Sequence, residues 1–211
     1  STTTTQRVTG LTNGTPYYFR VTAFSNVSGA ASEVVGPATP VAGPENTVTP
    51  AISGTRTYLQ TLTGSDGTWN NNGSTITATA YQWQVSSTST GTFTDIADAT
   101  SATFTISDSA YVGKYLRLKV TKTNGNGSNS AYSAVTAAIA GTPAGTPTIG
   151  TAVEASQQVS VPVTAPADLG GSTITGYKYS VDGGQTWSST VQLVDGNLVI
   201  GSLTNGTTYS V

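Results

Sequence analysis

A run near the end of the chain, Ser-Val-Asp-Gly-Gly-Gln-Thr-Trp at residues 180–187, has the spacing best suited to chemistry. The carboxylate of Asp182 can accept N–H bonds within a turn, and the two glycines that follow can adopt positive φ. Trp187 can then pack on the turn. Because this arrangement is typical of a β-hairpin, we expect Asp182 and Trp187 to fix a hairpin and to have a structural role.

Few other residues could carry catalysis. The chain contains no His and no Cys, so the Ser–His and Cys–His nucleophile pairs cannot be formed. A carboxylate pair for glycoside hydrolysis could come from Asp95 and Asp98, or from Asp66 with another acid. Their Thr, Gly and Ala neighbours indicate exposed turns. We therefore expect solvated loop acids, no catalytic residues and no enzymatic activity.

Calcium is the metal that this composition favours most, because it takes carboxylate and carbonyl oxygens. Asp66, Asp98 and Asp108 lie near predicted loops, but the sequence has no Asp-x-Asp-x-Asp cluster. The absence of Cys excludes disulfides and thiolate metal sites. The sequence predicts no cofactor, with bound calcium as the alternative.

Exposed aromatic side chains could bind glycans, and Trp69, Tyr58 and Tyr111 are the candidates in the middle of the chain. Packing in a core or at a sheet edge is the more common role of such rings. Asn-x-Ser/Thr acceptor patterns, which matter only if the host glycosylates surface proteins, begin at Asn13, Asn26, Asn72, Asn126 and Asn205. Surface glycans are therefore a candidate partner.

The formal net charge of −2 provides no basic field for phosphate backbones, so nucleic acid is not an expected partner. No run of about 18 apolar residues occurs, so no membrane insertion is expected in this segment. Val, Ile, Leu, Tyr and Trp recur in alternating runs among many Thr residues, whose β-branched side chains suit half-exposed strands. The composition favours a folded, all-β protein.

One tract is duplicated near the two ends of the sequence. Leu-Thr-Asn-Gly-Thr at residues 11–15, followed by Tyr17, returns at residues 203–207, followed by Tyr209, an offset of 192 positions. Self-similarity at fixed spacing is the signature of a modular array. We therefore expect tandem β-sandwiches, with incomplete terminal modules that are completed by the continuing chain or by a neighbouring subunit.

Alternation of apolar and polar residues divides the chain into three parts. Residues 1–40 are predicted to form strands at 2–8, 17–23 and 32–35, with a tight turn at Asn13-Gly14. They are followed by a Pro-rich linker over residues 36–50, where proline stiffens the backbone.

Residues 41–140 are predicted to form one complete module. Polar turns over residues 70–73 and 124–127 separate strand-like runs. These runs are 47–52, 57–62, 78–85, 102–106, 114–123 and 132–139.

A second Gly/Pro linker, residues 141–147, begins the third part, which extends over 141–211. Its predicted strands are 158–164, 176–181, 188–193, 198–200 and 207–211.

The pattern Leu11, Thr15, Tyr17, Phe19, Val21 resembles the E–F region of fibronectin type III domains. In that family the tyrosine forms a "tyrosine corner", in which its hydroxyl bonds back to the backbone. The resemblance implies that Tyr17 and its counterpart Tyr209 are core anchors. Residues 163–167 and 170–177 resemble the same family, with Val163 at the position usually held by Trp.

Tyr-Gln-Trp-Gln at residues 81–84, together with residues 112–120, resembles bacterial immunoglobulin-like repeats. This resemblance implies that Trp83 is the core tryptophan and that Leu116, Leu118 and Val120 face it. Lys122 is next in the inward register, and we expect its ammonium to reach water at the end of the sheet.

The pattern at residues 180–187 also resembles the Asp box of sialidase propellers, which would imply a glycan-processing enzyme. A propeller needs the box in every blade, whereas it occurs once in this chain, so the hairpin interpretation is favoured. The sequence predicts a non-catalytic segment of a secreted or surface-displayed fibre, sheath or stalk protein, located outside the cell, at its surface or on a virion. Its partners would be copies of itself or adjacent repeats. The alternative is a carbohydrate-binding or adhesin module, including one that is an appendage of a glycoside hydrolase.

Overall fold

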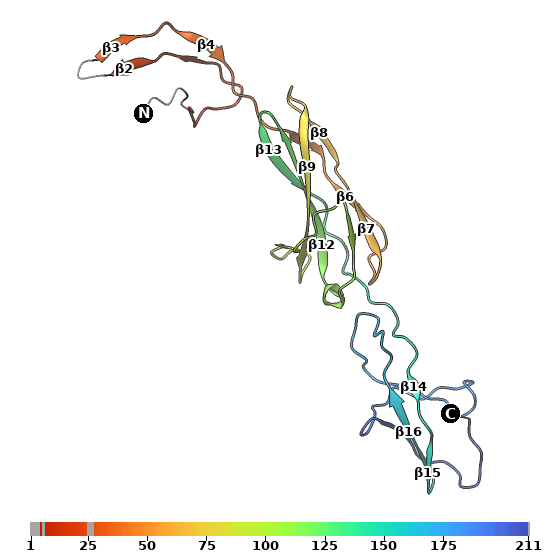
Figure 1. The fold of residues 1–211 in the computed structure, drawn as a ribbon. Helices are drawn as coiled ribbons and strands as arrows, with labels where there is room; N and C mark the ends of the chain where they lie inside the picture. The colour runs from red at the N-terminus through yellow and green to blue at the C-terminus, as the bar shows by residue number, and fades with distance from the viewer. Residues whose placement is uncertain (1–4, 6, 25–27, 211) are drawn as a thin grey trace.

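The computed structural model describes residues 5, 7–24 and 28–210. The described residues form β-strands and a single short 3-10 helix, Ser109–Tyr111, which confirms the expected all-β class. Three parts follow one another along an extended molecule (Figure 1). We call them the N-terminal ribbon (described residues up to 40), the central sandwich (45–140) and the C-terminal module (141–210).

The N-terminal ribbon consists of two pairs of antiparallel strands. β1 (Tyr17–Phe19) pairs with β4 (Val35–Ala38), and β2 (Thr22–Phe24) pairs with β3 (Ser28–Ala31). The strand expected over 2–8 is wrong for the described residues 5, 7 and 8, which are not extended in a sheet, and its other positions lie outside the described residues.

The strand expected over 32–35 is also wrong in its bounds, because the ribbon is interrupted at Ser32. The Ser32 N–H donates to Val21 O at 2.8 Å, while Val21 N–H donates to Ser32 Oγ at 3.0 Å. A side-chain hydroxyl thus replaces the carbonyl of a regular ladder, which separates β3 from β4.

The central sandwich has a three-stranded sheet in the order β11-β7-β6 and a four-stranded sheet in the order β10-β9-β12-β13. A separate pair, β5 with β8, lies at one end. The bounds are β5 Glu45–Val48, β6 Ala51–Ser53, β7 Thr61–Ser65, β8 Thr68–Asn70, β9 Ile76–Ser86, β10 Thr94–Asp95, β11 Thr103–Thr105, β12 Tyr115–Asn124 and β13 Gly127–Tyr132.

Alternation along β12 explains why the two sheets pack face to face. Leu116, Leu118 and Val120 are fully buried, and the residues between them are less so. Trp83 of β9, also fully buried, stacks on Phe104 of β11 with ring centroids 5.5 Å apart. The inward faces of both sheets therefore share one core, as in immunoglobulin-like and fibronectin type III-like sandwiches.

The strand expected over 132–139 is wrong, because β13 ends where that strand was predicted to begin. Beyond it, burial recurs every third residue, at Ser133, Thr136 and Ile139. The Ser133 and Thr136 hydroxyls accept the N–H groups of Leu118 and Leu116 at 2.9 and 3.0 Å. Side-chain hydroxyls again accept hydrogen bonds in place of backbone carbonyls, so this segment does not form a regular strand beside β12. Its buried side chains recur every three residues, whereas those of a strand recur every two.

The C-terminal module is built around β16 (Gln158–Thr164), whose predicted bounds are confirmed. β15 (Val153–Ala155) and β17 (Asn197–Ile200) pair with opposite edges of β16, and β14 (Thr148–Ile149) pairs with its end. A small core forms around Val161, Leu198 and Ile200.

The strands expected over 176–181, 188–193 and 207–211 are not regular strands in the described part of the chain. Two isolated bridges are present there, Tyr177 with Val191 and Asp182 with Ser210. Turn-forming side chains interrupt these segments, as the Asp182 loop described below illustrates. Val211 lies outside the described residues.

Candidate functional site

The duplicated tract forms the same structure twice. The Thr12 N–H donates to Tyr17 Oη at 2.9 Å, and the Thr204 N–H donates to Tyr209 Oη at 3.1 Å. Both tyrosines are half-buried. Each hydroxyl bonds to the backbone five residues upstream, which is the geometry of a tyrosine corner. These bonds also lower the pKa of Tyr17 and of Tyr209, because an N–H donor favours the phenolate.

Tyr209→Phe should remove the corner bond and leave the ring in place. We expect the Thr204 amide proton to exchange faster by a factor of roughly two to ten, the range for one net hydrogen bond, while the amides of β16 keep their protection. Tyr17→Phe is the matched variant and should affect Thr12 alone. Hydrogen exchange followed by NMR tests this, and unchanged exchange at Thr204 would contradict the assigned role.

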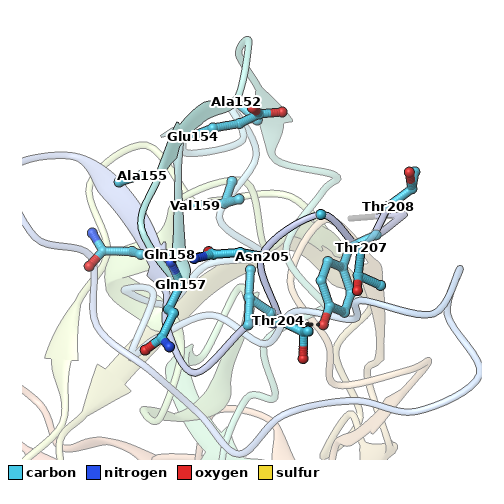
Figure 2. Close-up of a pocket in the computed structure, with 13 residues that line it drawn as sticks. Ala152, Glu154, Ala155, Gln157, Gln158, Val159, Thr204, Asn205, Thr207 and Thr208 are labelled. Carbon is cyan, nitrogen blue, oxygen red and sulfur yellow. Dashed lines mark hydrogen bonds between the residues drawn. The ribbon is translucent and has the colours of Figure 1, made fainter.

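The two corners differ in what covers them. At the first, Gly14 N–H donates to Pro40 O at 2.8 Å. The equivalent Gly206 N–H has no such backbone partner among the described residues. It lines a cavity of about 440 Å³ between the β15–β16 hairpin and the second corner (Figure 2). Among the described residues, the second corner thus lacks the backbone contact that Pro40 provides at the first.

Apolar side chains on the N-terminal ribbon are also uncovered. Tyr18, Val21, Phe24 and Val35 are each more than 60% exposed. Exposed apolar surface of this kind marks association sites when it is contiguous. The ribbon and the second corner are thus two candidate surfaces for pairing with further sheet.

The Asp182 loop forms the turn that the sequence predicts. One carboxylate oxygen of Asp182 accepts the N–H groups of Gln185 and Thr186 at 3.0 and 2.9 Å, and the other accepts the Thr186 hydroxyl at 2.6 Å. The buried Ser180 hydroxyl donates to Asp182 at 2.6 Å and accepts the Gly184 N–H at 2.8 Å. Trp187 is 63% exposed, in contrast to the packed ring expected, and its part in fixing the hairpin stays a prediction.

Hydrogen bonds from Ser180 and Thr186 hold the pKa of Asp182 well below its usual range. A depressed carboxyl pKa contributes stability above the unfolded value of about 3.9, and this is lost as pH falls below it. We expect the loop to be intact at neutral pH, to lose stability progressively below about pH 4, and to open as pH falls through the depressed pKa of Asp182. NMR shifts of the Gln185 and Thr186 amides, with Asp182→Asn as control, test this. The same acid transition in Asp182→Asn would assign it to other groups.

The candidate acids are occupied by structural contacts. Asp95 accepts the Gln84 amide at 2.6 Å, Asp108 accepts the Ala110 N–H at 2.8 Å, and Asp98 adopts a positive φ of 60° in a turn. No group of three or more His, Cys, Asp or Glu side chains among the described residues could hold a metal ion. The structure does not bring the three acids proposed for calcium into one site among the described residues.

Asp66 lies in a cluster that sequence reasoning missed. It accepts the Tyr81 hydroxyl at 2.5 Å and forms an ion pair with Lys122. The Lys122 side chain is only 11% exposed. That its ammonium reaches water stays a prediction, and the sequence did not predict its partner, a carboxylate 56 positions away.

The cluster shifts the pKa of two of its members. Burial alone would raise the pKa of Asp66, but bonds from Lys122 and Tyr81 outweigh it and lower the value. The bond to Asp66, with burial, raises the pKa of Tyr81 to about 12. These contacts describe a structural network inside the sandwich.

The aromatic residues proposed for glycan contact do not form an exposed row. Trp69 is half-buried against the core and donates its Nε1–H to Asp66 O at 2.8 Å. Tyr58 is half-buried, and Tyr111 packs edge-on against Phe104. The outer face of the four-stranded sheet instead places Arg117 between the rings of Phe93 and Tyr132, 4.5 and 4.3 Å from their centroids. These pairs stabilise the sheet through cation–π attraction.

Comparison with known proteins gives little further information. No family model and no curated protein matches the sequence. Among solved structures, the chain is similar to the crystal structure of the FN1–FN3 domains of chicken CNTN1, with 18% identity and a TM-score of 0.32. The match covers 75% of this chain and 56% of that one. The fold is assigned from the strand order. In addition, no helix among the described residues is long and apolar enough to cross a bilayer.

Proposed function

We propose that the chain is a non-catalytic structural segment of a secreted or surface-displayed fibre, sheath or stalk protein. The observation that supports this most is the recurrence of one tyrosine corner on both sides of the central sandwich, 192 positions apart. Repeated modules in tandem are suited to setting a distance between two ends.

We expect the partners of this segment to bind at two surfaces that the described chain leaves uncovered. The N-terminal ribbon exposes apolar side chains, and the second corner is open at Gly206. Strand addition would cover both surfaces, since main-chain bonds give affinity and alternate side chains give register. The donor is an adjacent repeat of the same chain or a copy of this chain.

Labelling of native material tests the proposal. Antibodies raised against the central sandwich should bind intact cells or virions of the source, and electron microscopy should show filaments with a regular axial repeat. Antibodies against a cytosolic protein are the control for leakage. Binding that occurs only after permeabilisation would contradict the surface role.

Glycan binding is the alternative function, and the exposure of Trp187 beside the Asp182 loop is the observation that favours it. Affinity electrophoresis in gels containing polysaccharide should then retard the protein but not the Trp187→Ala variant. Trp69→Ala and Tyr58→Ala test the residues that the sequence predicts, after their folding is checked by circular dichroism. Equal mobility with and without polysaccharide would reject this function.

A further inference from the structure

The linker between the central sandwich and the C-terminal module is bonded at both of its ends. On the side of the sandwich, Ala140 N–H donates to Arg56 O and Tyr58 N–H donates to Ala140 O, each at 2.8 Å. On the side of the C-terminal module, Thr142 N–H donates to Gly170 O at 2.8 Å and Gly145 N–H donates to Asp168 O at 2.9 Å. This linker is rich in Gly and Pro, yet backbone hydrogen bonds hold it at both ends. We call residues 141–147 the strap.

The loop that receives this strap also touches the sandwich directly. A Cβ atom added to Gly171 would lie 2.7 Å from Val112 Cγ2 and 3.1 Å from Tyr58 Cγ. A Cβ added to Gly170 would lie 1.9 Å from Thr142 O. Both glycines have positive φ, 65° at Gly170 and 80° at Gly171. The contact therefore requires glycine for two reasons, space and backbone conformation.

The turn that receives the linker is closely packed. Gly170 is buried, and the Thr142 hydroxyl oxygen is buried without a hydrogen-bond partner in the structure. Buried polar atoms are usually paired. An unpaired one at this position indicates that the linker packs closely on the Gly170-Gly171 turn.

We propose that Tyr58 and Val112 form a docking notch for the Gly170-Gly171 turn of the following module, and that this joint holds the two modules at a fixed angle. The inference deepens the proposed function and rests on it for its biological meaning, because a spacer with fixed angles transmits shape as well as distance. The joint itself is a property of the isolated chain. With a free seven-residue linker, the distance between the modules would instead vary over roughly 15 Å, from 5–6 Å per square root of residue number.

Spin labels test the joint directly, because the chain has no native Cys. Labels at Thr103→Cys in β11 and Glu154→Cys in β15, both exposed, report the distance between the two modules. Double electron–electron resonance should give one narrow distance distribution in the parent protein. A distribution with a spread on the order of 10 Å or more, as for a free linker, would overturn the proposal.

Two variants, one in each module, should break the contact between the modules. Gly171→Val introduces a clash in the C-terminal module, and Tyr58→Ala removes the wall of the notch in the sandwich. Both should broaden the distance distribution while circular dichroism and the amide spectra of each module stay folded. Narrow distributions in both folded variants would also overturn the proposal.

Gly201→Ala is the matched control, because an added Cβ at Gly201 meets nothing within 4 Å. It should leave the distribution narrow. Thr142→Val removes the unpaired hydroxyl and should keep the joint closed with equal or higher stability, whereas a loss of stability would show a solvated junction. Surface labelling of native material is independent of these results, so failure of the joint and failure of the proposed function are distinguishable.

Discussion

Trp83→Ala should destabilise the central sandwich by about 3–5 kcal/mol, the range for deleting a buried aromatic side chain. Trp83 is fully buried, stacks on Phe104, and donates its Nε1–H to Ser101 O at 2.9 Å. The substitution removes contacts to both sheets at once and leaves a cavity that the strands on either side cannot close. Denaturant unfolding followed by near-UV circular dichroism measures the loss.

The chain provides its own control for this experiment. Trp187 is 63% exposed, so Trp187→Ala should change stability by less than about 0.5 kcal/mol. If Trp83→Ala costs no more than Trp187→Ala, the shared core of the two sheets is not the main source of stability in the central sandwich.

Asp66→Ala should destabilise the central sandwich by about 2–4 kcal/mol. Loss of one partner leaves the nearly buried Lys122 ammonium without its carboxylate, and breaking a buried pair costs about 3–5 kcal/mol. The range is reduced because 32% of the Asp66 side chain is exposed to solvent, which screens the pair. Glu45→Ala, an exposed acid in β5, is the control and should be nearly neutral.

The double variant Asp66→Ala, Lys122→Met distinguishes the contribution of the ion pair to stability from that of side-chain packing. Replacing both charges by apolar groups is often close to neutral, so the double variant should be more stable than Asp66→Ala alone. If the two substitutions are simply additive, Lys122 does not depend on Asp66 and the cluster is not a coupled unit.

The pKa of Tyr81 reports on the same cluster, and a loss of packing alone would not change it. Its pKa is raised to about 12 by the bond to Asp66, and should return towards the ordinary value of about 10 in Asp66→Ala. A raised pKa contributes stability that is present below about pH 10 and lost as pH rises through about 12. Ultraviolet titration of tyrosinate measures the shift, and a Tyr81 pKa that stays near 12 in the variant would contradict the assignment.

Local periodicity in the sequence was sufficient to predict much of this fold. Alternation at residues 116–120 predicts which side chains of β12 are inward, because successive strand residues point to opposite faces. The duplicated tract predicts two tyrosine corners through its resemblance to the fibronectin type III E–F region, and each corner bond is local, to the residue five positions upstream. The Asp182 loop is equally local, and its acceptor bonds were expected from the residue types alone.

Only the tertiary structure decided the contacts between distant parts of the chain. Lys122 is paired with Asp66 across the sandwich, the segment after β13 follows β12 with a period of three, and Gly171 packs against Tyr58 and Val112. Each depends on which surfaces meet after the sheets have formed, and local alternation carries no information on that. The sequence alone therefore determined the inward face of β12, the bounds of β16 and the two corners, whereas packing determined the ion pair and the joint between modules.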